Sequence, residues 1–266
     1  MNFTLRILGT ASAMPISDTN PSAQVLSVHG RLFLIDCGEG TQQRLRQMHL
    51  GFLKIEAVCI SHIHGDHVFG LFGLLSSMAM FNRTAPLKVF GPQALGPILR
   101  FWQSFFGDGC NYEIDFHSLT GSGMECVYEN KSLKISAFPL SHKIDCYGYR
   151  FDEVLGTRAL SEGRCPRSYA YCSDTMPFPE LEDFVRGVSV LYHETTYLKD
   201  MKDKALAYAH STTADAASLA LRAGVGKLLV AHYSSRVREK ELFQKECREI
   251  FEDSYALSDC EVVEID

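Results

Sequence analysis

Short apolar runs, several of them alternating with polar residues, recur along the whole chain and predict many β-strands. We expect strands at residues 3–9, 25–28, 32–36, 57–60, 87–91, 112–119, 125–129, 133–140, 147–151, 168–172, 188–192, 228–231 and 260–265. Helical patterns are expected at 41–48, 68–80, from Pro92 towards Phe106, 212–223 and 238–251. Residues 152–166 show no strong periodicity and are expected to form an irregular connection. Mixed strands and helices of this kind predict an α/β fold.

A polar cluster interrupts this pattern between the strand at 57–60 and the helix at 68–80. The segment Ser61–His67 carries three imidazoles and one carboxylate in the pattern His-x-His-x-Asp-His. Burying so many ionisable groups without partners would cost several kcal/mol. Imidazole and carboxylate ligands suit zinc or a similar divalent ion, so the cluster predicts a metal site on a strand-to-helix turn.

Further ionisable side chains follow the ends of other expected strands, where ligand sites in α/β folds tend to lie. They are His142, Asp174, Glu194 and His232, with His210 shortly before the helix at 212–223. Taken singly, each of them also fits a turn residue or a hydrogen-bonded core residue. Taken together with Ser61–His67, they supply about the seven protein ligands that two zinc-type ions need.

Composition limits the setting of this site. The chain of 266 residues has no Pro/Gly/Ser-rich linker, so we expect one domain over 1–266. Neither a signal peptide nor a membrane-spanning stretch is evident. Nine scattered cysteines without a CxxC pair indicate a reducing compartment, and we expect a cytoplasmic protein without a membrane partner. A net charge of −6 provides no general attraction to nucleic acid.

The ordered set of motifs resembles the metallo-β-lactamase superfamily, and within it the ribonuclease Z (tRNA 3′-processing endonuclease) branch. The resemblance rests on Leu8-Gly9-Thr10-x-Ser12-Ala13-x-Pro15, Asp36-Cys37-Gly38-Glu39-Gly40-Thr41-Gln42, the Ser61–His67 cluster, Ser141-His142, Ser173-Asp174-Thr175, His193-Glu194-x-Thr196, His210-Ser211-Thr212 and His232-x-Ser234-x-Arg236. It implies a four-layer αβ/βα sandwich, in which two mixed sheets pack face to face with helices outside. It also implies a homodimer.

The resemblance assigns a role to each candidate residue. His62, His64 and His142 would hold one metal ion, Asp66, His67 and His232 the second, and Asp174 would bridge them. The ions would be zinc, with manganese or another divalent metal as alternatives, and a hydroxide shared between them would attack a phosphodiester. Asp66 would orient or deprotonate the attacking water, His210 paired with Glu194 would act as general acid, and Asp36 would brace the ligand loop.

One departure from this family leaves the substrate open. Ribonuclease Z enzymes usually carry a long tRNA-gripping arm between the residues corresponding to His142 and Asp174, but only 31 residues separate them here. The chain is therefore expected to process the 3′ ends of precursor tRNA, or to cleave a small or cyclic phosphodiester. Hydrolysis of a lactam or thioester, and a non-catalytic metal-stabilised subunit, are further alternatives.

Overall fold

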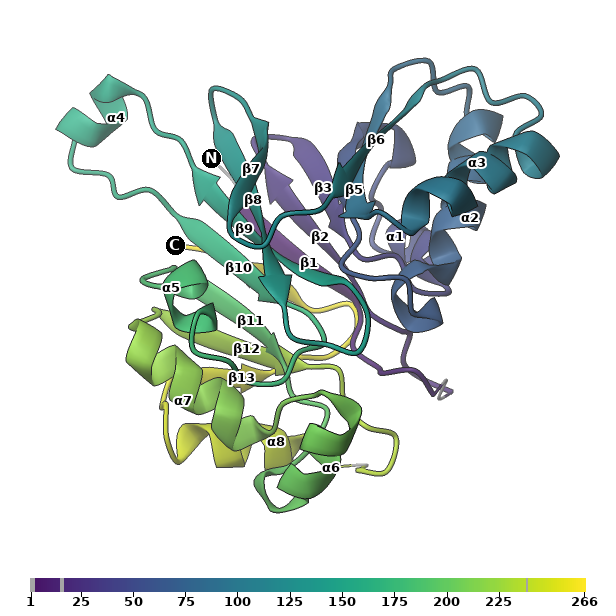
Figure 1. The fold of residues 1–266 in the computed structure, drawn as a ribbon. Helices are drawn as coiled ribbons and strands as arrows, with labels where there is room; N and C mark the ends of the chain where they lie inside the picture. The colour runs from purple at the N-terminus through teal and green to yellow at the C-terminus, as the bar shows by residue number, and fades with distance from the viewer. Residues whose placement is uncertain (1–2, 15–16, 238) are drawn as a thin grey trace. The chain divides into compact units, whose positions relative to one another are not determined.

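The computed structural model describes residues 3–14, 17–237 and 239–266. Pro15 of the first motif and Arg238, the expected first residue of the last helix, lie outside the described residues. The chain divides into two compact units (Figure 1). Unit 1 comprises Met1–Thr120 and Ser258–Val263, and unit 2 comprises Gly121–Leu257 and Glu264–Asp266. Among the described residues, no helix is long and apolar enough to cross a membrane.

Unit 1 is built on a mixed sheet with the strand order β14-β1-β2-β3-β4-β5-β6. The strands are β1 (Phe3–Gly9), β2 (Ala23–Val28), β3 (Arg31–Ile35), β4 (Ile55–Cys59), β5 (Leu87–Pro92), β6 (Ile114–Leu119) and β14 (Val262–Glu264). Strands β1 to β3 pair in antiparallel fashion, whereas β3 to β6 are parallel. Because β3 and β4 are parallel neighbours, the residues that follow them emerge at the same edge of the sheet.

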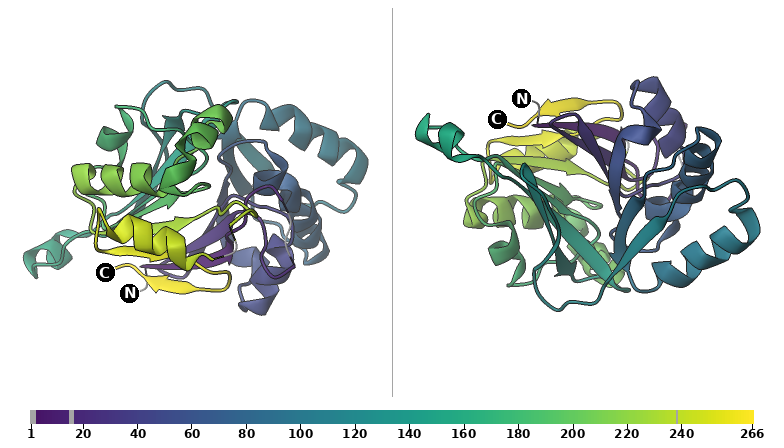
Figure 2. Two further views of the ribbon diagram at one scale, coloured as in Figure 1. Left: turned by 90° about the horizontal axis from the view of Figure 1, so that it is seen from below. Right: turned by 90° about the horizontal axis from the view of Figure 1, so that it is seen from above.

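The helices of unit 1 lie on one face of this sheet (Figure 2). They are α1 (Thr41–Gln47), α2 (Gly65–Met80) and α3 (Leu95–Phe106), together with the 3-10 turn η1 (Phe52–Lys54). The buried side of α2, which includes Leu71, Leu74 and Met78, packs with sheet residues such as Val58 and Val89 in one apolar core. This packing holds the first turn of α2 at the edge where β3 and β4 end.

Unit 2 contains a second mixed sheet, with the strand order β13-β12-β11-β10-β9-β8-β7. The strands are β7 (Glu125–Glu129), β8 (Leu133–Leu140), β9 (Cys146–Glu153), β10 (Ser168–Cys172), β11 (Val190–Glu194), β12 (Lys227–Ala231) and β13 (Ser254–Ala256). Strands β7 to β10 are antiparallel neighbours, and β10 to β13 are parallel. The carboxyl ends of β10, β11 and β12 therefore meet at one edge.

Unit 2 has helices as well, of which α4 projects away from the sheet (Figure 1). They are α4 (Thr157–Ser161), α5 (Leu181–Val185), α6 (Lys202–Tyr208), α7 (Thr213–Ala223) and α8 (Glu241–Arg248), with the 3-10 turn η2 (Lys199–Met201). The start of α7 is set by a capping box: the Asp215 amide donates to the Thr212 hydroxyl, and the Asp215 carboxylate accepts from the Thr212 amide. Gly224 ends this helix in the left-handed conformation, as the sequence predicts.

The structure corrects several sequence-based boundaries. Pro92 does not open a helix: it is the last residue of β5, in register with Leu119 of β6, and α3 begins at Leu95. A proline at a strand end removes no hydrogen bond that the ladder needs. The last helix begins at Glu241, and the last expected strand is shortened to β14. The sequence did not indicate α5, α6 or β13, which are too short to show a period.

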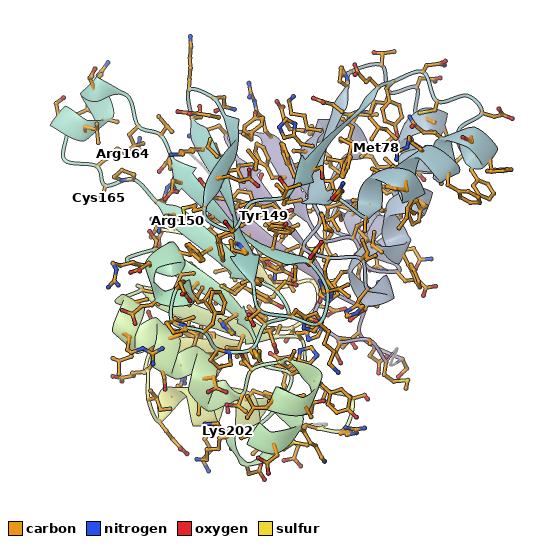
Figure 3. The ribbon with its side chains drawn as sticks, in the orientation of Figure 1. Met78, Tyr149, Arg150, Arg164, Cys165 and Lys202 are labelled. Carbon is orange, nitrogen blue, oxygen red and sulfur yellow. The ribbon has the colours of Figure 1, made fainter. Side chains whose placement is uncertain are left out.

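The expected irregular connection at 152–166 is also wrong in part, because it contains α4. Residues 154–166 leave the sheet after β9, form this short helix and return to β10, with Arg164 and Cys165 on the returning segment (Figure 3). A buried ion pair closes the base of the excursion. The Arg167 guanidinium donates to both carboxylate oxygens of Glu153, at 2.9 and 2.7 Å, and the Glu153 amide donates to the Arg167 carbonyl at 2.8 Å.

This ion pair predicts a specific loss of stability in acid. Burial alone would raise the pKa of Glu153, but hydrogen bonds from Arg167 and the charges of Arg167 and Arg164 hold that pKa below its usual 4.5. The ionised carboxylate therefore stabilises the fold fully above about pH 4.5, and this contribution disappears as the pH falls through the lowered pKa. Glu153→Gln should lower the free energy of unfolding near neutral pH by about 2 kcal/mol, as expected for lost charged hydrogen bonds.

Urea unfolding at neutral and acid pH would measure this effect. The deficit of Glu153→Gln should shrink as the pH drops. Glu162→Gln, which removes an exposed partner of Arg158 on the same excursion, should change stability by less than about 0.5 kcal/mol. An equal deficit of Glu153→Gln at both pH values would contradict the assignment.

Candidate metal centre

Asp36 is the polar hub of the site in unit 1. It follows β3, is fully buried, and has a positive φ of 52°. One carboxylate oxygen accepts the Ser61 amide at 2.7 Å, and the other accepts the Ser61 hydroxyl at 2.9 Å and His67 Nδ1 at 2.8 Å. Asp36 thereby joins the segment that follows β4 to the first turn of α2.

Two glycines allow α2 to approach this edge closely. The Cys37 amide donates to the His67 carbonyl, and the Gly70 amide donates to the Cys37 carbonyl, each at 2.8 Å. A Cβ atom on Gly70 would collide with the Gly38 carbonyl oxygen, and one on Gly38 would collide with the Asp66 carbonyl oxygen. Only glycine permits this contact at both positions, and the contact sets the place of Asp66 and His67 at the start of α2.

Four side chains of unit 1 form what we call the N-terminal donor set: His62, His64, Asp66 and His67. His62 Nε2 lies 2.9 Å from His64 Nδ1, and His67 Nε2 lies 3.4 Å from an Asp66 carboxylate oxygen. Because the Asp36 carboxylate accepts from Nδ1 of His67, the neutral form of His67 has its lone pair on Nε2, beside Asp66. An imidazole lone pair and a carboxylate oxygen are both ligands for a divalent cation.

Glu194 is the corresponding hub of unit 2. It ends β11 and is fully buried. One carboxylate oxygen accepts His210 Nδ1 at 3.0 Å, the Ser211 amide at 2.8 Å and the Thr175 amide at 3.3 Å, and the other accepts the amide and hydroxyl of Thr196, both at 2.8 Å. Burial would raise the pKa of Glu194, but the charge and hydrogen bond of His210 and the charges of His232 and His193 lower it to about 2. Glu194 is therefore an anion at neutral pH.

Three side chains of unit 2 form the C-terminal donor set: His142, Asp174 and His232. They follow β8, β10 and β12 respectively. His142 donates from Nδ1 to the Ala209 carbonyl at 2.8 Å, so the neutral ring has its lone pair on Nε2, which lies 3.8 Å from Asp174. His232 Nε2 lies 3.3 Å from the other Asp174 oxygen. Asp174, His210 and His232 each offer a ligand atom within 4.8 Å of one another.

These two sets fit a divalent metal of the zinc type. In each set, imidazole nitrogens lie close to carboxylate oxygens at distances that are long for direct hydrogen bonds, as expected where ligands converge on a cation. In each set, a second polar group already occupies the other ring nitrogen of a histidine, the usual arrangement around metal-binding histidines. Cysteine ligands are not indicated, because burial raises the pKa of Cys37, Cys59 and Cys172 and keeps these thiols neutral.

The structure brings the sequence-predicted residues together within each unit. Asp36 contacts His67, and Glu194 contacts His210. Two contributors were missed, the hydroxyls of Ser61 and Thr196, each next to a buried carboxylate and a histidine. Their positions inside two of the sequence motifs were the available signal. His193, to which no role was assigned, is buried and bonds the Glu194 carbonyl.

The chain is similar to known proteins over nearly its whole length. The family model described as "Anti-Pycsar protein Apyc1" matches residues 3–255. A ribonuclease Z of Porphyromonas gingivalis is 33% identical over 298 aligned positions, which cover 97% of each chain. Among solved structures, human tRNase Z, short form, superposes with a TM-score of 0.84 at 24% identity and 99% coverage of both chains. The metallo-β-lactamase fold protein YhfI from Bacillus subtilis gives a TM-score of 0.79 at 19% identity, covering 99% of this chain and 100% of that one.

Two mixed sheets with their helices give this chain the metallo-β-lactamase fold and confirm the expected α/β class. With its ribonuclease Z relatives, the chain is a metal-dependent hydrolase. More narrowly, the chain belongs to the ribonuclease Z family and to the family that the Apyc1 model describes.

The Asp36 hub predicts a loss of metal affinity when its acceptor is removed. Asn tolerates the positive φ and has nearly the same volume, but its amide nitrogen cannot accept from the Ser61 hydroxyl and His67. Asp36→Asn should lower zinc affinity about 10–100-fold, measured by competition with a chromogenic chelator. Asp115→Asn, which alters a half-exposed partner of Lys88 in the same unit, should bind zinc like the wild type. Unchanged affinity in Asp36→Asn would contradict the bracing role.

Proposed function

We propose that the two donor sets together hold two zinc ions and that the chain is an endoribonuclease that processes tRNA 3′ ends. One observation carries this proposal: in each unit, a set of metal-ligand side chains lies just after the parallel strands and is held by a buried carboxylate. Neither set alone has enough donors for two metal ions. Unit 1 offers four donors and unit 2 offers three, whereas two zinc-type ions need about seven. For this reason we also propose that the units form one hydrolase domain over residues 1–266.

The ligands would divide between the ions as in the ribonuclease Z pattern. His62, His64 and His142 would hold one ion, Asp66, His67 and His232 the other, and Asp174 would contact both. Zinc suits this set of nitrogen and oxygen donors, with manganese as the alternative. When bound, two such ions lower the pKa of a water molecule and neutralise charge that develops on the phosphoryl oxygens.

Two side chains of the protein would transfer protons during the reaction, one as a base and one as an acid. Asp66 orients the attacking water or accepts its proton. His210 donates a proton from Nε2 to the leaving oxygen, while its Nδ1–H stays bonded to Glu194. Because the pKa of Glu194 is lowered to about 2, the carboxylate is charged at neutral pH and favours the imidazolium form of His210. His210 is also the more exposed member of this pair, so its ring can reach a substrate.

A small or cyclic phosphodiester is the second candidate substrate. Between His142 and Asp174, the described chain contains β9, the short excursion around α4 and β10, without a long arm. The alignment with the Porphyromonas ribonuclease Z spans 298 positions, so that relative has segments without a counterpart among these 266 residues. The matching family model, moreover, is described as an anti-Pycsar protein rather than as a tRNA-processing enzyme.

We also propose a cytoplasmic homodimer. All nine cysteines are free thiols, as expected in a reducing compartment. Of the aromatic group on α3, Trp102 is buried in the core, whereas Phe101, Phe105 and Phe106 are 58–68% exposed. Such apolar side chains on one helix suit a subunit contact better than a base-stacking platform.

A direct comparison of substrates tests the proposed function. Metal-loaded protein should cleave precursor tRNA at its 3′ end, and both a chelator and Asp174→Ala should reduce cleavage to background, measured by gel electrophoresis of the products. Asp183→Ala, an exposed change on α5, should cleave like the wild type. Cleavage of a cyclic nucleotide without cleavage of tRNA would establish the second candidate. Failure on every diester by metal-loaded protein would point to a lactam or thioester hydrolase, or to a non-catalytic subunit.

The role of His210 predicts a dependence on the leaving group. A ribose oxygen would leave as a strongly basic alkoxide and therefore needs a proton, whereas nitrophenolate is a weak base and leaves without one. His210→Ala should therefore reduce kcat for RNA cleavage about 10²–10⁴-fold, but reduce hydrolysis of bis(4-nitrophenyl) phosphate far less. His117→Gln, outside both donor sets, should leave both rates unchanged. Equal losses on the two substrates would remove His210 as the general acid.

A further inference from the structure

The Thr196 hydroxyl lies at the centre of the polar network of unit 2. Its oxygen is 2.8 Å from a Glu194 carboxylate oxygen, 2.8 Å from His232 Nδ1 and 3.2 Å from His210 Nδ1. The residue is buried, with 5% exposure, so these protein groups are its natural partners. A hydroxyl has one proton to donate and lone pairs that accept, so the direction of each contact can be worked out.

Glu194 determines that direction. Its carboxylate accepts three backbone amides and His210 Nδ1 besides the hydroxyl, which is the environment of an ionised, acceptor-only group. The Thr196 proton must therefore point to Glu194. The Thr196 oxygen is then an acceptor towards His232, so His232 carries its proton on Nδ1. In the neutral ring, which is the form that binds a metal, the lone pair is then on Nε2, the atom that lies 3.3 Å from Asp174.

The same arrangement occurs independently in unit 1. The Ser61 hydroxyl lies 2.9 Å from an Asp36 oxygen and 2.9 Å from His62 Nδ1. A buried carboxylate thus accepts a hydrogen bond from the hydroxyl, and the hydroxyl oxygen accepts one from Nδ1–H of a donor-set histidine. Each carboxylate also bonds a second histidine directly, His67 in unit 1 and His210 in unit 2.

From this geometry we propose that Thr196 is a positioning residue, which prepares His232 for metal binding by holding its proton on Nδ1, and that Ser61 does the same for His62. The carboxylate polarises the hydroxyl that donates to it, and the hydroxyl oxygen then becomes a stronger acceptor for the imidazole Nδ1–H. This makes Nε2 a stronger donor and fixes the plane of the ring. The inference rests on the proposed function only in taking His232 and His62 as metal ligands.

Substitution of the hydroxyl tests this role through metal affinity rather than activity. Thr196→Val keeps the shape of the side chain but leaves His232 Nδ1 without its acceptor, and should weaken zinc binding about 10–100-fold in a chelator competition. Thr196→Ser restores the hydroxyl and should restore affinity. Thr195→Val is the matched control, because this neighbouring buried hydroxyl donates to the Ala231 carbonyl, at 3.3 Å, and to no donor-set residue among those that the structure describes. Its affinity should stay within about threefold of the wild type.

A measurement on the unaltered protein covers the case in which Thr196→Val does not fold. Long-range proton–nitrogen NMR spectra of metal-free protein at mildly alkaline pH report which ring nitrogen of each histidine is protonated. His232 and His62 should both be in the Nδ1–H form. Protonation at Nε2, or wild-type affinity in Thr196→Val, would overturn the inference while leaving the proposed function intact. Absence of metal binding by the wild type would instead defeat the proposed function itself.

Discussion

A buried carboxylate with its shell of hydrogen bonds is the interaction on which each half of this molecule depends. Asp36 in unit 1 and Glu194 in unit 2 have no solvent exposure, and an unpaired charge in such a place would be very costly. Asp36 accepts one backbone amide and Glu194 accepts three, and each also accepts one hydroxyl and one imidazole. The bonds that satisfy the carboxylate also orient the histidines, so the stability of each strand end and the geometry of each donor set have the same origin.

The parallel parts of the two sheets explain why each carboxylate can reach segments that follow neighbouring strands. Parallel neighbours end at the same edge, which places the segment after β3 beside that after β4, and the segments after β10, β11 and β12 beside one another. Loops at such edges can carry polar residues that a sheet interior excludes. Close backbone contact at Gly38 and Gly70 then brings the first turn of α2 into the same region of unit 1.

In the proposed function, chemistry and substrate selection have separate structural bases. The donor sets, Glu194 and His210 belong to strand ends and the turns next to them. The segment between β9 and β10 is a short excursion closed by the Glu153–Arg167 pair. A hydrolase can change its substrate by altering such a peripheral segment while the reacting groups stay in place.

The sequence by itself determined the kind of site, most of the strands and the residues with reactive side chains, because strand periodicity and the spacing of histidines and carboxylates are local properties. It could not supply the short elements α4, α5 and β13, or the role of Pro92, since these depend on contacts between distant segments. Only the tertiary structure decided that Ser61 and Thr196 each stand between a carboxylate and a histidine. Serine and threonine are common at turns, so the sequence does not single these two out. Each is distinguished by a hydroxyl proton that points to a buried carboxylate, and folding brings that carboxylate and the histidine to the hydroxyl.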